Sequence, residues 1–395
     1  MELTPQNAQT VELSKSGDDV AIAIEHGGTR ARIDFVDREG ESIISAVEGR
    51  FVSEGFEIEL PNYQRVGELG ARPADLPQMT VNVLRELLRP MIDEFGIRKL
   101  GYSIAGPVTE EGVVLKGAQL WGETVTGVRY RDLLEEELGL LGGVVLGNDM
   151  WAAAHDIMAH GGAWSPPFNV ESFCVITVSS GVGSKVVLKG DIQLGVSGTG
   201  GEIGHMPILH PDEMIPGRIC GCGGRYCLEA GSSGNANAYR TKAEAESPAV
   251  QATFAASAEL IDRIRRIDLS PSPDLPERVR AINGVVIEGG KQNDSFALHV
   301  LDRTIRPIAR AVAALEVQLN IGNFYFVGGF ALALGETFLR ILRGHIIEMG
   351  IIGRTRQQLE RIGRLYNEPE QKWGLRGVGM AAHRLVKTSV RGHHT

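Results

Sequence analysis

The chain has 395 residues, of which 43% are hydrophobic and 23% are charged, and its formal net charge is −9. This length favours two domains with separate cores, and the acidic balance, without a long basic block, argues against a nucleic-acid partner. Residues 1–18 are polar and predict a flexible leader rather than a signal peptide, and no apolar run could span a bilayer, so we expect a cytoplasmic protein without membrane attachment.

Two segments of the chain share one pattern. Residues 20–36, VAIAIEHGGTRARIDFV, predict a strand, a tight glycine turn and a second strand, and residues 173–192 repeat this order around SSGVGS. A glycine turn that carries a hydroxyl either only closes a hairpin or exposes backbone N–H groups to a phosphate. The repetition favours the phosphate role and indicates two similar lobes that face each other across a cleft.

The stretch between these hairpins contains a strand followed by two polar residues. The elements expected here are an irregular segment at 54–78, a helix at 79–95 that Pro90 kinks or splits, a strand near 98–104, a hairpin-like segment at 108–118, a helix at 130–138, a strand at 143–146 and a helix at 150–160. Asn148 and Asp149 follow the last strand, where open α/β sheets place ligand chemistry. Taken alone, Asp149 would be interpreted first as the N-cap of the next helix.

Residues 198–229 hold three of the four cysteines and are rich in glycine and proline. His205, Cys220, Cys222 and Cys227 form a complete tetrahedral ligand set for a structural Zn²⁺, whereas Cys174 lies in an apolar strand and is interpreted as a core thiol. Glu202 and Glu229 flank the set. Held by the metal, they suit hydrogen bonding to polyol hydroxyls; without it they would be solvated loop acids.

The chain beyond residue 229 is predicted to be largely helical. The expected elements are helices at 235–246, 250–267, 295–319, 335–347 and 374–387, a Pro/Ser-rich loop at 270–276 and a strand at 324–327. Gly328 and Gly329 follow that strand, either as a simple turn or as a close approach of the backbone to a ligand.

Taken in order, the motifs GGT, Asn-Asp, Ser-Gly-x-Gly, GEIGH, CGCGGRYCLE and VGGF resemble the ROK family (repressor, open reading frame, kinase) over about residues 19–388. The resemblance implies an α/β, two-lobed, actin-like ATPase (ribonuclease H-like) fold with a central cleft and a zinc-binding loop at 201–229. The lobes would comprise 19–147, joined by the C-terminal helix within 374–395, and 148–373. Too few residues precede the first strand for a repressor's DNA-binding helices, which favours the kinase branch.

The resemblance also implies ATP-dependent, Mg²⁺-dependent phosphorylation of a sugar or polyol hydroxyl by a homodimer. Asp149 would be the general base. The implied substrate contacts are Gln119, Asn148, Glu202, His205 and Glu229. The implied nucleotide or phosphate contacts are Glu25, Gly27, Gly28, Thr29, Arg30, Ser180, Gly181, Gly183, Gly328 and Gly329.

Some residues depart from the family pattern. Glu25 and Arg30 replace the usual Asp and Lys of the phosphate turn, and Ser184 and Lys185 replace glycines, with Lys185 either directed to the phosphates or on the surface. These departures indicate a substrate other than plain glucose: an amino sugar, a modified hexose or a cyclitol. The alternatives are a non-catalytic sugar sensor on the same scaffold and a zinc-stabilised interaction module.

Overall fold

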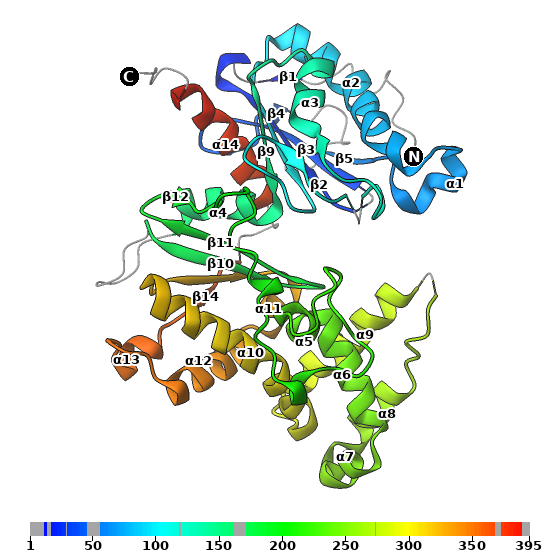
Figure 1. Cartoon of the computed structure of the whole chain (residues 1–395), viewed down its shortest axis with the longest axis vertical. Helices are drawn as coiled ribbons and strands as arrows, with labels where there is room; N and C mark the ends of the chain where they lie inside the picture. The colour runs from blue at the N-terminus through cyan, green and yellow to red at the C-terminus, as the bar shows by residue number, and fades with distance from the viewer. Residues whose placement is uncertain are drawn as a thin grey trace. The chain divides into compact units, whose positions relative to one another are not determined.

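The computed structural model describes residues 12–13, 17–28, 30–45, 56–117, 120–161, 171–272, 274–367 and 373–388. The chain forms two compact units (Figure 1). Unit 1 comprises residues 1–162, 192–200 and 368–395, and unit 2 comprises residues 163–191 and 201–367. The expected boundary at 147/148 therefore differs from the observed division, which keeps helix α4 (Asp149–His160) in unit 1.

Unit 1 is built on a five-stranded mixed sheet in the order β5-β3-β2-β6-β9. Its strands are β2 (Ala21–His26), β3 (Arg30–Val36), β5 (Phe56–Glu59), β6 (Leu100–Ile104) and β9 (Val144–Asn148). The predicted hairpin is confirmed, because β2 and β3 pair antiparallel, while β6 and β9 are parallel to β2. Strand β5 falls in the segment that we expected to be irregular; four residues are too few to carry a clear alternation.

Helices cover both faces of this sheet. The larger core packs α2 (Leu76–Phe95) and α3 (Tyr130–Leu138) against one face, where Ile22 and Ile24 of β2 are buried. Ala21 and Ala23 point to the other face and pack with α4 and α14 (Trp373–Thr388). A Cβ on Gly101 of β6 would lie 2.1 Å from the Val378 carbonyl oxygen, so a glycine is needed where α14 meets the sheet.

Two expectations for unit 1 need correction. Helix α2 begins at Leu76 and is not split by Pro90, which lies on its exposed side where the missing N–H costs least. Residues 12–13 of the expected leader form a strand, β1 (Glu12–Leu13), paired with β4 (Ile44–Ser45). The remaining described elements of this unit are α1 (Val66–Leu69), β7 (Val113–Val114) and β8 (Val128–Arg129).

Unit 2 repeats the strand order of unit 1. Its sheet runs β12-β11-β10-β13-β14, so that in both sheets the first strand is central and the hairpin partner lies on one side of it. Its strands are β10 (Phe173–Val178), β11 (Val182–Leu188), β12 (Asp191–Ile192), β13 (Phe324–Val327) and β14 (Arg364–Leu365). The antiparallel β10–β11 pair and the parallel β10–β13 pair confirm the predicted internal duplication.

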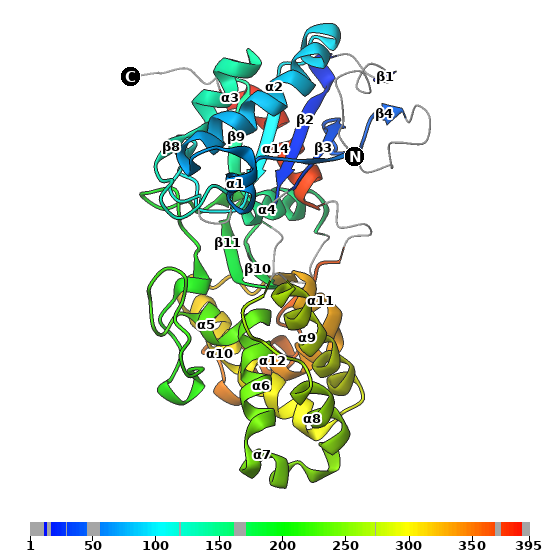
Figure 2. The same ribbon diagram turned by 90° about the vertical axis from the view of Figure 1, so that its right-hand side faces the viewer.

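Apart from the 201–227 loop, the rest of unit 2 is mostly helical, and Figure 2 shows α6, α8 and α9 side by side. The helices are α5 (Leu228–Ser232), α6 (Gly234–Glu246), α7 (Pro248–Thr253), α8 (Ala258–Arg265), α9 (Leu275–Lys291), α10 (Ser295–Leu319), α11 (Gly329–Leu334), α12 (Glu336–Met349) and α13 (Arg356–Leu359). The helix expected at 250–267 is broken into α7 and α8 by a short 3-10 turn at Ala255–Ser257. Among the described residues, we find no helix long and apolar enough to cross a membrane.

Candidate active site and metal centre

The candidate groups of unit 1 gather at one edge of its sheet. His26, Ile104 and Asn148 lie side by side in the register of the parallel strands, so β2, β6 and β9 end together. The glycine turn leaves β2 at this edge and is closed by a hydrogen bond from Gly27 N to Arg30 O of 2.9 Å. The sheet therefore carries the Gly27–Gly28 turn and the Asn148–Asp149 pair on the same edge.

The N-cap role that we considered for Asp149 belongs instead to Asn148. The Asn148 side-chain oxygen accepts a hydrogen bond from Trp151 N at 2.8 Å, and Asp149 is the first residue of α4. Asp149 Oδ1 accepts from Met150 N at 2.9 Å. A carboxylate in the first turn of a twelve-residue helix is stabilised by the helix dipole. The capping expectation for Asp149 was therefore wrong by one residue.

Glu25 is held in place from two directions. Its carboxylate forms an ion pair with Arg32, the residue opposite it on β3. A Cβ on Gly374, in the first turn of α14, would lie 2.6 Å from Glu25 Cδ, so α14 approaches the carboxylate closely. Burial raises the pKa of Glu25, and Arg32 opposes that shift. Arg30 pairs with Glu57 of β5 at 2.7 Å and is the more exposed of the two arginines.

The candidate phosphate groups of unit 2 lie around the end of β10. The turn between β10 and β11 consists of Ser179, Ser180 and Gly181, whereas Gly183 lies within β11 opposite Thr177, so its expected place in the turn was wrong. Gly328 has φ +91°, and a Cβ there would lie 2.5 Å from Thr177 Oγ1. The turn and the Gly328–Gly329 junction therefore meet at one end of β10.

Two of the candidate glycines have open space in front of them. A Cβ built on Gly28 or on Gly329 would meet no atom within 4 Å. These backbone positions can be approached closely by a ligand such as a phosphate chain, which is the arrangement expected of a nucleotide site. Thr29 and Gln119, which we expected to contact nucleotide and substrate, lie outside the described residues.

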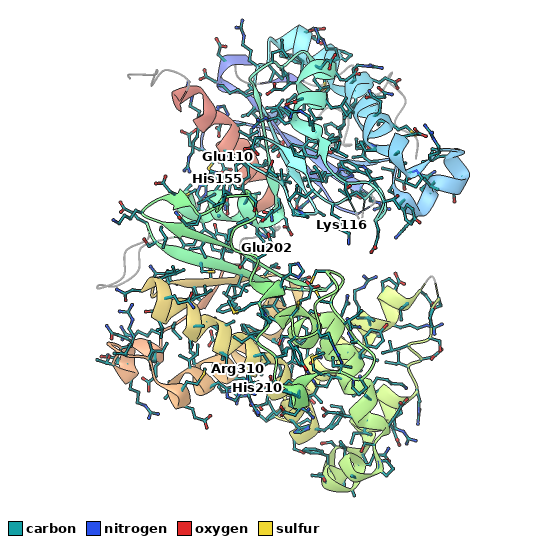
Figure 3. The ribbon with its side chains drawn as sticks, viewed as in Figure 1. Glu110, Lys116, His155, Glu202, His210 and Arg310 are labelled. Carbon is teal, nitrogen blue, oxygen red and sulfur yellow. The ribbon has the colours of Figure 1, made fainter. Side chains whose placement is uncertain are left out.

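The two candidate polyol acids are both anchored to β11. Glu229 Oε2 accepts from Val182 N at 3.0 Å, and a Cβ on Gly181 would lie 2.7 Å from that oxygen. Glu202, which is labelled in Figure 3, accepts a hydrogen bond at Oε1 from Lys185 Nζ at 3.1 Å. Lys185 is only 2% exposed, so the surface alternative that we considered for it was wrong, while the phosphate alternative stays a prediction.

The predicted metal ligands come together in unit 2. The ligand atoms of His205, Cys220, Cys222 and Cys227 all lie within 4.8 Å of one another. Cys220 Sγ is 3.3 Å from His205 Nδ1, and the sulfurs of Cys222 and Cys227 are 3.5 Å apart. Tetrahedral bonds of about 2.0–2.3 Å to zinc bring ligand atoms to roughly these separations. Three thiols and one imidazole therefore fit a divalent zinc ion.

The thiols themselves also favour a cation. Burial raises the pKa of the Cys220 thiol to about 12, and burial raises that of Cys227, whereas the Gly224 N–H lowers that of Cys222. Zinc binds thiolates, so a cation at the cluster would supply the positive charge that the two buried thiols need to lose their protons. With Nδ1 of His205 directed at Cys220, Nε2 is the nitrogen left for another partner.

Backbone hydrogen bonds tie the metal loop to the acids. Leu228 N donates to Met206 O at 2.9 Å, and Pro207 and Cys227 form an antiparallel bridge. These contacts join the His205 end of the loop to the start of α5, which carries Glu229. A metal in the cluster would therefore fix the segment that positions both acids.

Sequence reasoning missed Arg32, Gly374 and the ion pair of Lys185. Arg32 was within reach of sequence reasoning, because a hairpin places the strand residues on either side of its turn opposite each other, and the observed register pairs Glu25 with Arg32. Gly374 is 349 residues away from Glu25, and no local pattern signals that contact.

The comparisons with known proteins agree with this geometry. A family model described as "ROK family" matches residues 21–348. A C(7)-cyclitol 7-kinase from Streptomyces hygroscopicus subsp. limoneus is 36% identical over 311 residues, which cover 78% of this chain and 80% of that protein. An N-acetylmannosamine kinase from Vibrio cholerae serotype O1 is 25% identical over 317 residues, 80% of this chain and 85% of that one.

A solved structure shares the fold. The ROK family glucokinase from Streptomyces griseus, in complex with glucose and AMPPNP, matches with a TM-score of 0.63 at 22% identity and covers 92% of this chain and 99% of its own. At this identity the likeness is one of fold.

Proposed function

The chain belongs to the ROK family, and we propose from this membership and from its site residues that it is an ATP-dependent kinase of a sugar-like polyol. The observation that carries the proposal is the shared sheet edge in unit 1, where Asp149 and the Gly27–Gly28 turn lie together. Among polyols we favour a cyclitol, because the relative at 36% identity is named a C(7)-cyclitol 7-kinase. An amino sugar or modified hexose is the next candidate.

In this proposal Asp149 accepts the proton of the attacking hydroxyl. Its carboxylate is half-buried, and one of its oxygens accepts from Met150 N, which orients the side chain. Positioning and charge stabilisation dominate phosphoryl transfer, so a fixed carboxylate at a helix start suits this role. Asn148 uses its side-chain oxygen as a cap and keeps its amide group as a donor toward a hydroxyl oxygen.

In unit 1 the open backbone at Gly28, with Arg30 close by in sequence, would receive a phosphate of ATP. In unit 2 the candidate phosphate contacts are Gly329 and the turn that contains Ser180. Mg²⁺ would supply charge neutralisation at the transferred phosphoryl group. Glu25 is the acid of unit 1 that would face the hydrated ion, and its partner Arg32 already neutralises part of its charge. We therefore assign Glu25 to the ordering of water around the metal rather than to direct ligation.

The polyol would be recognised by Glu202 and Glu229, with Nε2 of His205 as a further contact. Zinc bound by His205, Cys220, Cys222 and Cys227 would hold the loop that carries these groups. Metal analysis of the purified protein tests this part: about one zinc per chain is expected. A protein that contains no zinc and keeps its polyol affinity after chelation would contradict it.

The central experiment is an ADP-release assay with ATP, Mg²⁺ and a panel of cyclitols, hexoses and amino sugars. Wild-type protein should turn over at least one polyol. Asp149→Asn should bind that polyol with unchanged affinity and lose about 10²–10⁴-fold in kcat, the usual worth of general-base catalysis.

Asp294→Asn is a matched control for this experiment. Asp294 is the N-cap of α10 and accepts from Ala297 N at 2.9 Å, and asparagine caps equally well, so its activity should stay that of wild type. Near wild-type turnover by Asp149→Asn would refute the base assignment. Binding of a polyol without ADP release by the wild type would point instead to a sensor on the same scaffold.

A further inference from the structure

Strand β11 carries a lysine where a buried charge is unexpected. The Lys185 side chain is 3% exposed, and its ammonium donates to Glu202 Oε1 at 3.1 Å. A buried ammonium is costly unless it is paired and hydrogen-bonded, so this ion pair is a specific feature of the fold. Glu202 itself is 30% exposed and is reachable by a ligand.

The neighbouring residue supports the same segment. The Ser184 hydroxyl donates to the Gly201 carbonyl, so successive side chains of β11 hold successive residues of the 201–202 turn. Gly201 has φ +87°, and a Cβ there would lie 3.3 Å from Lys185 Cα, which shows how closely the turn packs on the strand. Ser184 therefore fixes the backbone beside Glu202, while Lys185 fixes its carboxylate.

The ion pair divides the roles of the two carboxylate oxygens. Oε1 of Glu202 is engaged by Lys185, and within the described part of the chain Oε2 accepts no hydrogen bond. Each carboxylate oxygen has two acceptor sites, so the ion pair occupies a site on Oε1 and leaves Oε2 as the oxygen with both of its sites open to ligand hydroxyls. The chemistry of Lys185 thus bears on which hydroxyl pattern the site prefers.

We propose that Lys185 is a positioning residue for polyol recognition, which holds Glu202 through Oε1 so that Oε2 accepts a hydrogen bond from a ligand hydroxyl. The proposal rests on the proposed polyol site and deepens it. In this proposal Lys185 acts on polyol binding and not on nucleotide binding, and it helps to determine which polyol is bound.

The test uses Lys185→Met, which keeps an unbranched side chain that is one heavy atom shorter and removes its charge. Polyol affinity is measured without ATP by calorimetric titration of the full chain with glucose, N-acetylmannosamine and a seven-carbon cyclitol. For the probe that wild type binds best, Lys185→Met should raise Kd and KM ten- to hundredfold and leave the KM of ATP within twofold of wild type. Lys185→Gln, which keeps an N–H donor, should lose less. Lys291→Met changes an exposed lysine of α9 and should match wild type.

Each outcome decides the matter. A rise in the KM of ATP with unchanged polyol affinity would overturn the proposal and direct Lys185 to the phosphates. Unchanged affinity for both ligands in a less stable protein would reduce Lys185 to a structural role. If Lys185→Met does not fold, Lys185→Gln decides by the same comparison. Failure of the kinase proposal is seen separately, as polyol binding by the wild type without ADP release; a wild type that binds none of the probes overturns both.

Discussion

Replacing Gly374 with alanine should lower the activity of the protein and leave its stability nearly unchanged. The new methyl group would lie 2.6 Å from Cδ and Oε2 of Glu25 and 2.8 Å from Oε1. Ordinary contacts need about 3.5 Å, so the carboxylate must retreat by roughly 1 Å, which a flexible side chain can do without moving the backbone. A displacement of this size in a catalytic site costs about 100-fold in rate. We therefore expect kcat/KM for ATP to fall ten- to hundredfold in Gly374→Ala.

The same change should leave the free energy of unfolding nearly unaltered. Alanine stabilises a helix interior by up to about 1 kcal/mol relative to glycine, and less in the first turn. The Arg32–Glu25 pair that it disturbs has side chains 31% and 20% exposed, for which a loss of up to about 1 kcal/mol is expected. The two effects oppose each other, so urea unfolding should place the variant within about 1 kcal/mol of wild type.

Gly344→Ala provides the control. Gly344 lies in α12, and a Cβ there would meet no atom within 4 Å, so alanine should add about 1 kcal/mol of stability without changing activity. The assay measures ADP release at varied ATP and Mg²⁺. Wild-type ATP kinetics in a folded Gly374→Ala protein would refute the reasoning, because the activity would then not depend on the observed position of the Glu25 carboxylate.

Three further predictions rest on single contacts. Gly181→Ala should displace Glu229, because the added Cβ would lie 2.7 Å from Glu229 Oε2. The Kd of the polyol should rise at least tenfold in calorimetric titration. An unchanged Kd would show that Glu229 does not contact the polyol. Arg376→Gln should lower the free energy of unfolding in urea by about 3–5 kcal/mol, because it leaves the fully buried Asp156 carboxylate without the guanidinium nitrogen that lies 3.0 Å away. A clearly smaller loss would contradict this expectation. Burial lowers the pKa of His26 and of His155 to about 3, so between about pH 6.5 and 3 the unfolded chain binds protons that the folded chain does not. The free energy of unfolding should therefore fall by about 1.4 kcal/mol per pH unit for each histidine as the pH drops through this range. His155→Gln should make this dependence on pH less steep, as measured by thermal unfolding at several pH values.

Patterns of local spacing predicted much of the fold. The apolar spacing of residues 295–319 gave α10 with the observed bounds, and the glycine turns predicted both hairpins. Strand β5 was missed because a four-residue edge strand has little alternation to detect. Asn148 and Asp149 were predicted at a sheet edge because they follow a strand, not because of their composition. The structure agrees, because the parallel strands of this sheet end together.

The contacts that orient the site were less accessible from the sequence. The His/Cys cluster could be identified by residue type, since three closely spaced cysteines with a nearby histidine are a recognised pattern for zinc. The hydrogen bond from Val182 N to Glu229 joins residues 47 apart, and the approach of Gly374 to Glu25 spans most of the chain. Such contacts depend on how whole elements pack, and a local pattern does not encode them.

The two hairpins show how a duplicated unit can acquire different roles. Each has a short glycine-containing turn and a central first strand, yet the residues beside the turns differ in charge. In unit 1 the strand before the turn carries Glu25, neutralised across the hairpin by Arg32. In unit 2 the strand after the turn carries Lys185 and the Val182 N–H, which hold the acids of a separate loop. The first hairpin thus carries an acid of its own beside its glycine turn, while the second supports acids supplied by another segment.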